Sequence, residues 1–126
     1  MNKFLLDAAR LGFIACALVT VAFAFAPARS GAHLFPWDKA DHFSAFFAIT
    51  TAGVVAFPRV RLVWIALVAS AAGAAIELIQ GLSWVGRDCD VWDWVAENAA
   101  IAAVIGLVIA SELRRRLQAI GSGGEA

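Results

Sequence analysis

The chain has 126 residues, of which 62% are hydrophobic and only 16% are charged, and its mean hydropathy is +0.79. A soluble domain carries about 25% charged residues, and one of this size buries only about two-thirds of its surface. Ten Lys and Arg residues balance ten Asp and Glu residues, so no basic excess indicates nucleic-acid binding. Gly-rich phosphate loops, CxxC pairs and zinc-ligand spacings do not occur. The composition therefore indicates a single membrane domain.

The first predicted transmembrane helix covers residues 10–28. After Arg10 this segment contains no charge, and a span needs about 20 apolar residues. Pro27 and the small polar residues behind it end the segment. A signal peptide is the alternative, because Ala24-Phe25-Ala26 is similar to a cleavage site, but the apolar run exceeds the usual length of about 7–15 residues.

Three further apolar segments follow in the chain. They cover residues 38–57, closed by Pro58, residues 62–82, and residues 91–112, closed by Arg114. Their apolar runs are continuous and do not alternate with period two, which excludes a β-barrel pattern. The Gly-rich tail 119–126 is expected to be disordered. We therefore predict an all-α, polytopic membrane protein, a four-transmembrane-helix bundle that forms one domain over residues 1–126.

The distribution of basic residues predicts the orientation of the bundle. With four spans, one side of the membrane holds Lys3, Arg10, Arg59, Arg61, Arg114, Arg115 and Arg116. The other side holds Arg29, Lys39 and Arg87. Because cytoplasmic segments carry the excess of Lys and Arg, both termini are predicted to be cytoplasmic. Trp residues then form belts, with Trp37, Trp84, Trp92 and Trp94 outside and Trp64 inside. Cys16 and Cys89 are separated by this topology and are not expected to form a disulfide.

Ionisable residues lie near the outer ends of the last three predicted spans. They form one helical face each: Asp38 and His42; Ser70, Gly73, Glu77 and Gln80; Asp90, Asp93 and Glu97. With a rise of about 1.5 Å per residue, the deepest members lie about 6–9 Å from the helix ends. A charge within the bilayer costs at least about 2.5–3.5 kcal/mol at the centre, so such residues face the bundle interior. We expect the three faces to meet at one depth.

One interpretation of this convergence is a structural clamp. Lys39, His42 and Arg87 would neutralise the carboxylates, and Ser70 and Gly73 would let the helices approach closely. We expect the outer cations to be drawn to the carboxylates closest to water, which are Asp38, Asp90 and Asp93. Glu77 and Glu97 would then share a proton with each other or with His42.

A second interpretation is an outward-facing polar pocket that holds a ligand headgroup. Its predicted binding residues are Asp38, Lys39, His42, Glu77, Gln80, Arg87, Asp90, Asp93 and Glu97. Catalysis is a third interpretation, with His42 as general base oriented by Asp38 or Glu77 and with Asp93 as a further candidate. A metal site built from His42, Glu77, Asp93 and Glu97 is the least favoured, because no spacing motif supports zinc. We therefore expect no metal and no cofactor.

The same residues resemble the motifs of the VanZ-like family of small polytopic membrane proteins. The family's Asp-Lys-x-x-His-Phe-x-x-Phe motif is matched by Asp38, Lys39, His42, Phe43 and Phe46. Its Glu-x-x-Gln motif and its Arg with spaced aspartates are matched by Glu77, Gln80, Arg87, Asp90 and Asp93. The resemblance covers about residues 10–112. Two positions depart from the pattern: Glu97 replaces an Asn or Asp, and Ala100 replaces a Gly.

The resemblance implies a role in the cell envelope, since the family's namesake is associated with resistance to the glycopeptide teicoplanin. It implies no defined reaction, and it does not imply resistance for this chain. Together with the predicted pocket, it suggests a multi-pass protein of the inner (plasma) membrane that binds or modulates an envelope lipid, a lipid-linked sugar or a glycopeptide-like amphiphile. An enzyme acting on a lipid headgroup and a structural subunit are the alternatives. No nucleic-acid partner is expected, and homo-oligomerisation is left open.

Overall fold

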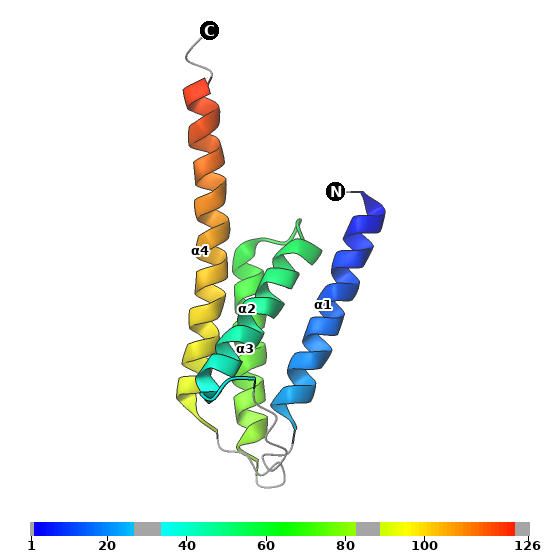
Figure 1. Cartoon of the computed structure of the whole chain (residues 1–126), viewed down its shortest axis with the longest axis vertical. Coiled ribbons are helices and arrows are strands. Elements are labelled where there is room, and N and C mark those ends of the chain that lie inside the picture. Colours follow the sequence, from blue (N-terminus) through cyan, green and yellow to red (C-terminus); the bar gives the residue numbers. More distant parts are fainter. Residues whose placement is uncertain (1, 27–33, 83–88, 123–126) are drawn as a thin grey trace.

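The computed structural model describes residues 2–26, 34–82 and 89–122, and all regular structure in these ranges is α-helical (Figure 1). Its helices are α1 (Lys3–Ala24), α2 (Asp38–Ala56), α3 (Leu62–Gln80) and α4 (Val91–Ser122). The predicted all-α class and the presence of a helix in each predicted segment are therefore confirmed.

The helices run alternately up and down the bundle (Figure 1). The start of α1, the end of α4 and the link between α2 and α3 lie toward one end of the bundle, and the end of α1 and the starts of α2 and α4 lie toward the opposite end. Helix α2 packs most extensively against α4 and also against α1 and α3. Because α2 contacts all three other helices, its residues are the ones that reach every part of the interior.

Two helix boundaries differ from the prediction by more than four residues. Helix α1 begins at Lys3 because the Asn2 side chain caps it, accepting a hydrogen bond of 2.9 Å from the Leu5 N–H. Helix α4 continues beyond the predicted end at Glu112 to Ser122, so residues 119–122 are helical and not disordered. Arg is a good helix former, and Glu112 accepts a hydrogen bond from Arg116 one turn later. Charge ends the apolar segment there but not the helix.

Among the described residues, the interior combines apolar side chains with polar and charged ones. The buried hydrophobic residues are Phe46, Ala56, Ala100, Ile101 and Val104. The buried polar residues are Thr50, Glu77, Gln80, Asp93 and Glu97. On α4 these positions repeat every three or four residues, which is the period of one helix face. Ala100 is fully buried on this face and lets α4 approach its neighbours closely.

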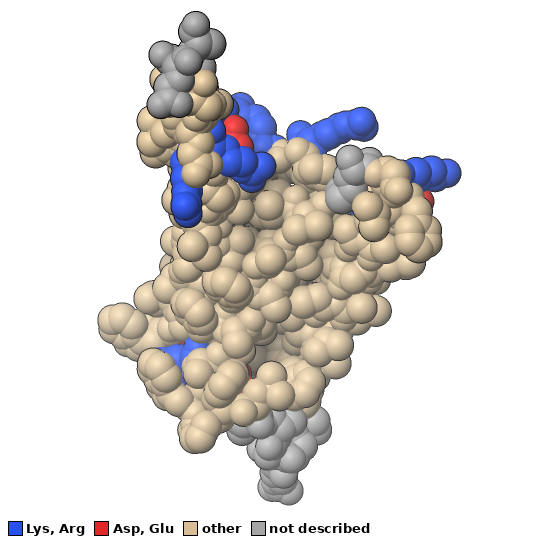
Figure 2. All heavy atoms as spheres, turned by 45° about the horizontal axis from the view of Figure 1, so that its top comes forward, with Lys and Arg blue, Asp and Glu red and all other residues tan. Residues whose placement is uncertain are grey.

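Large apolar side chains lie on the outside of the bundle. Leu18 on α1, Val68 on α3 and Leu107 on α4 are each more than 60% exposed. Helices α1, α3 and α4 are long and apolar enough to cross a membrane. A charged interior under an apolar exterior is the opposite of a soluble domain, and it fits a bilayer as the solvent. Figure 2 shows basic side chains gathered at the end of the molecule that carries the termini, above a broad surface without charge.

Close packing of α4 predicts a sharp contrast between two alanines on that helix. Replacing the buried Ala100 with Leu overfills the interface, and we expect a loss of about 1–3 kcal/mol in the free energy of unfolding. Replacing Ala103, which is exposed, with Leu adds the same side chain on the outer face and should leave stability unchanged. Thermal unfolding in one detergent compares the two, and equal melting temperatures would contradict the packing described here.

Candidate functional site

A cluster of ionisable side chains from three helices forms the centre of the candidate site. Helix α2 contributes His42, α3 contributes Glu77, and α4 contributes Asp93 and Glu97. Glu97 Oε1 accepts a hydrogen bond from His42 Nδ1 at 2.9 Å. Glu77 Oε1 lies 3.6 Å from the same nitrogen, and Asp93 Oδ2 lies 3.9 Å from His42 Nε2. The three predicted polar faces therefore meet around one imidazole.

Lys39 forms the outer part of the cluster. Its ammonium donates hydrogen bonds to Asp90 Oδ2 at 2.7 Å and to Asp93 Oδ1 at 3.1 Å. The Lys39 contact, assisted by the Trp92 N–H, holds the pKa of the Asp90 carboxyl below its usual value. Lys39 thus pairs with two of the three carboxylates expected for the outer cations, Asp90 and Asp93, although Asp93 is buried and not close to water.

Glu77 connects the cluster to the segment before α4. Its Oε2 accepts a hydrogen bond of 3.1 Å from the backbone N–H of Asp90. Its Oε1 is buried, points toward His42, and accepts no hydrogen bond from any described residue. Glu77 is only 4% exposed, so desolvation of this half-satisfied carboxylate is costly.

Gly73 makes room for the carboxylate of Glu97. Both residues are buried, and a Cβ built at position 73 would overlap with Glu97 Oε2. The same Cβ would lie 3.2 Å from Phe46 Cζ, so the Glu97 carboxylate and the Phe46 ring would both have to shift. Gly73, which the sequence places on the polar face of α3, therefore leaves space for the Glu97 carboxylate of α4.

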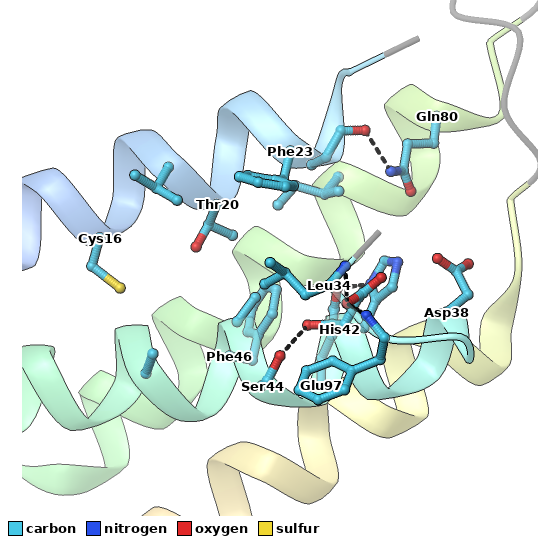
Figure 3. A pocket seen from close by; sticks show the side chains of 17 residues that line it. Cys16, Thr20, Phe23, Leu34, Asp38, His42, Ser44, Phe46, Gln80 and Glu97 are labelled. Carbon is cyan, nitrogen blue, oxygen red and sulfur yellow. Dashed lines mark hydrogen bonds and ion pairs between the residues drawn. The ribbon is translucent and has the colours of Figure 1, made fainter. Parts of the chain in front are cut away.

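A cavity of about 350 Å³ adjoins the cluster and lies between α1 and the other helices. Its wall is apolar where α1 contributes Cys16, Val19 and Phe23, and polar where His42 and Glu97 reach it. Figure 3 shows the labelled α1 side chains on one side of this cavity and the imidazole on the other. The cavity therefore has an apolar wall and a polar end.

Gln80 and Asp41 shape the polar end of the cavity. Gln80 Nε2 donates a hydrogen bond of 2.8 Å to the carbonyl of Ala24, which ties α3 to the end of α1 (Figure 3). Asp41 Oδ1 accepts hydrogen bonds from the backbone N–H groups of Leu34 and Phe35 and so fixes the segment before α2. Asp41 was not predicted from the sequence, because it is not one of the motif positions in this helix turn.

Several predicted site residues have other outcomes. Asp38 lines the cavity. One ligand atom from each of Asp38, His42 and Asp93 can be chosen so that the three atoms lie within 4.8 Å of one another. Glu97, and not Asp38 or Glu77, makes the short contact with His42. Arg87 lies outside the described residues, as do Arg29 and Trp84. Cys16 and Cys89 are free thiols, as expected.

The arrangement has a definite chemical capacity. A carboxylate on Nδ1 orients an imidazole and stabilises its protonated form, as in acid–base catalysis. The carboxylates of Glu97 and Asp38 and the amide of Gln80 can accept hydrogen bonds from a polar group in the cavity. Hydrogen bonding of a bound headgroup and proton transfer to it are both compatible with this geometry.

Close contact at Gly73 predicts a further pair of variants. Gly73→Ala forces the Glu97 carboxylate away from His42, and we expect a loss of about 1–3 kcal/mol in stability. Gly106→Ala is the matched control, because a Cβ there meets nothing within 4 Å. Alanine has the higher helix propensity, so this control should be unchanged or stabilised by up to about 1 kcal/mol. Thermal melts that rank the two variants in the opposite order would disprove the role of Gly73.

Comparison of the chain with protein-family models, with curated proteins and with solved structures finds no match. The resemblance to the VanZ-like family therefore stays a prediction based on the motifs themselves. Five of the motif residues lie together and are joined by direct contacts: Lys39, His42, Glu77, Asp90 and Asp93. The shared position of these residues is an observation about this fold, and it does not depend on the family assignment.

Proposed function

We propose that the chain is a four-span, multi-pass protein of the inner (plasma) membrane that belongs to the VanZ-like family and has both termini in the cytoplasm. Helices α1, α3 and α4 satisfy the length and hydropathy of a span. Helix α2 carries its charged residues Asp38, Lys39 and Asp41 in its first turn, and the remainder is apolar apart from His42 and small hydroxyl residues. Because α2 packs against the other three helices, we infer that it crosses the same bilayer alongside them.

Reporter fusions test this topology. Alkaline phosphatase, which is active only outside the cytoplasm, should be inactive when fused after Ser122 or after Arg59, and active when fused after Leu82. The fusion at Arg59 tests α2, because a chain that begins in the cytoplasm and does not cross the membrane with α2 would place both this link and the carboxyl terminus outside. Green fluorescent protein at the same sites should show the reverse pattern. Phosphatase activity at the carboxyl terminus would overturn the proposed orientation.

We further propose that the cavity binds a membrane amphiphile with its headgroup against His42 and Glu97. The observation that carries this proposal is the composition of the cavity wall, which is apolar along α1 and polar at the cluster. Small-molecule sites combine an apolar lining with a few placed polar groups in this way. An acyl chain would contact Cys16, Val19 and Phe23, and its headgroup would reach the imidazole.

Charge at the polar end favours a headgroup with hydrogen-bond donors. Glu97, Asp38 and Asp41 line this end with carboxylates, whereas Lys39 is engaged by Asp90 and Asp93. Carboxylates accept hydrogen bonds and donate none, so hydroxyl groups are their natural partners. A sugar-bearing lipid fits this pattern better than a bare anion. The envelope role implied by the family resemblance supports the same class of ligand.

Binding of glucosyl-diacylglycerol, with diacylglycerol as the matched probe without sugar, tests the proposal. In a detergent that carries no sugar, native mass spectrometry should show that the wild-type protein prefers the glycolipid at least about tenfold, which corresponds to about 1.4 kcal/mol. Cys16→Phe fills the apolar wall and should weaken binding of both lipids. His42→Gln alters the polar end and should remove the preference for the sugar.

Two controls separate binding from folding. Ala15→Phe adds the same ring to an exposed position of α1 outside the cavity lining and should leave binding unchanged. The melting temperature of each variant is measured in the same detergent, because removal of one partner from a buried charged network can cost about 3–5 kcal/mol. Equal affinity for both lipids in the wild-type protein would contradict recognition of the headgroup. Parallel loss of stability and binding in all cluster variants would favour a structural clamp.

An enzyme acting on the headgroup is the second candidate, and the short contact between Glu97 and His42 favours it. This contact orients the imidazole from Nδ1, as required of a general base. Incubation of the protein with glucosyl-diacylglycerol, followed by measurement of released glucose, distinguishes the candidates. Release that is lost in His42→Gln would establish hydrolysis, and the absence of release together with retained binding would establish a binding protein.

A further inference from the structure

Carboxylates outnumber cationic groups at the centre of the cluster. Among the described residues, Glu77, Asp93 and Glu97 are buried there, and the nearest basic side chains are Lys39 and His42. The Lys39 ammonium lies between Asp90 and Asp93. Among the described residues, the imidazole is therefore the one basic group beside Glu77 and Glu97, and it carries at most a single positive charge.

Two carboxylate oxygens in this cluster have no hydrogen-bond donor among the described residues. Glu77 Oε1 points toward His42, and Glu97 Oε2 lies against Gly73. Glu77 is 4% exposed and Glu97 is fully buried. A buried, unpaired carboxylate oxygen is costly, and structures usually satisfy it with a donor or a cation. The unpartnered Glu77 oxygen therefore points to a positively charged ligand at this place.

Distances among the donor atoms fit a single small cation. Two ligand atoms bound to one ion at about 2.1 Å can be no farther apart than about 4.2 Å. His42 Nδ1 lies 2.9 Å from Glu97 Oε1 and 3.6 Å from Glu77 Oε1, so both pairs satisfy this limit. One atom from each of these three residues can be chosen so that all lie within 4.8 Å of one another. Within that group, the largest separation therefore exceeds the limit for one ion by at most about 0.6 Å.

We propose that His42, Glu77 and Glu97 form a binding site for a divalent cation. The cation takes the place of the proton between His42 Nδ1 and Glu97 Oε1, and that proton is released to solvent. One imidazole and two carboxylates form a mixed nitrogen and oxygen donor set. Such a set suits Mn²⁺ or Zn²⁺ better than it suits an ion that prefers oxygen ligands alone. This assignment reverses the expectation drawn from the sequence, where no spacing motif was present because each ligand comes from a different helix.

Position in the fold gives this site access and open coordination. His42 and Glu97 both line the cavity, so the cation would face it and the protein would supply only three ligands. Lys39 and Asp93 would form the outer layer, with Asp93 Oδ2 3.9 Å from His42 Nε2. A carboxylate beside the free nitrogen of a metal-binding histidine fixes the orientation of its ring. Neither feature requires a bound lipid, so the site stands independently of the function proposed above.

Metal titrations of the purified full-length protein test the site. The protein is stripped with a chelator in detergent and titrated with Mn²⁺, followed by electron paramagnetic resonance, and separately with Zn²⁺, followed by calorimetry. We expect saturable binding of one ion per chain. Glu97→Gln should weaken it by at least about tenfold, and Glu77→Gln should do the same if the first variant does not fold. Glu112→Gln is the matched control and should bind as the wild type, because Glu112 is exposed and pairs with Arg116.

Coordination by His42 gives a readout on folded wild-type protein. Bound Mn²⁺ should show coupling to an imidazole ¹⁴N nucleus. This signal should persist in His33→Gln, which replaces the other histidine of the chain, and be absent in His42→Gln. Failure of both ions to bind, affinity unchanged by Glu97→Gln and Glu77→Gln, or absence of the ¹⁴N coupling in the wild type would overturn the proposal. Glycolipid binding is measured on the same stripped samples, so its persistence without metal binding would refute the metal site alone.

Discussion

The contact between His42 and Glu97 is the interaction on which the polar interior depends. Glu97 is fully buried within a bundle whose exterior is apolar, so its carboxylate must find its partners inside the protein. Helix α2 supplies the imidazole, and α3 supplies the space through Gly73. The three helices are therefore positioned relative to one another by one charged group, and a substitution at any of the three residues affects the other two.

Helix α2 packs against the other three helices and also carries part of the candidate site. Its first turn carries the charged residues, and its later buried positions Phe46, Thr50, Gly53 and Ala56 form the face that contacts its neighbours. This division explains why α2 has the weakest apolar signature of the four helices and yet packs against all the others. Charged residues near one end of a span lie close to water, whereas those facing the interior require partners from other helices.

Much of this arrangement was predictable from the sequence, because helical period and charge are both readable there. The polar faces of α3 and α4 were predicted from spacing, and Gly73, Glu77, Gln80, Asp93 and Glu97 are indeed buried. The pairing within the cluster was not predictable, since spacing along one helix does not determine which carboxylate of another helix reaches His42. The cavity wall on α1 was also missed, because its apolar residues carry no signal that distinguishes a ligand surface from a lipid-facing one. Asn98, the amide next to Glu97, bonds to the carbonyl of Trp94 in its own helix, and Glu97 is the residue that occupies the buried position.

Helix α1 differs from the other helices in having no buried residue and in packing mainly against α2. It nevertheless forms one whole wall of the cavity, where it is held at its end by the hydrogen bond from Gln80. Because α1 has no buried residue, little buried surface is lost when this wall moves. In the proposed four-span arrangement, movement of α1 would consequently open the cavity sideways, between α1 and its neighbours, into the hydrocarbon layer rather than toward the aqueous phase.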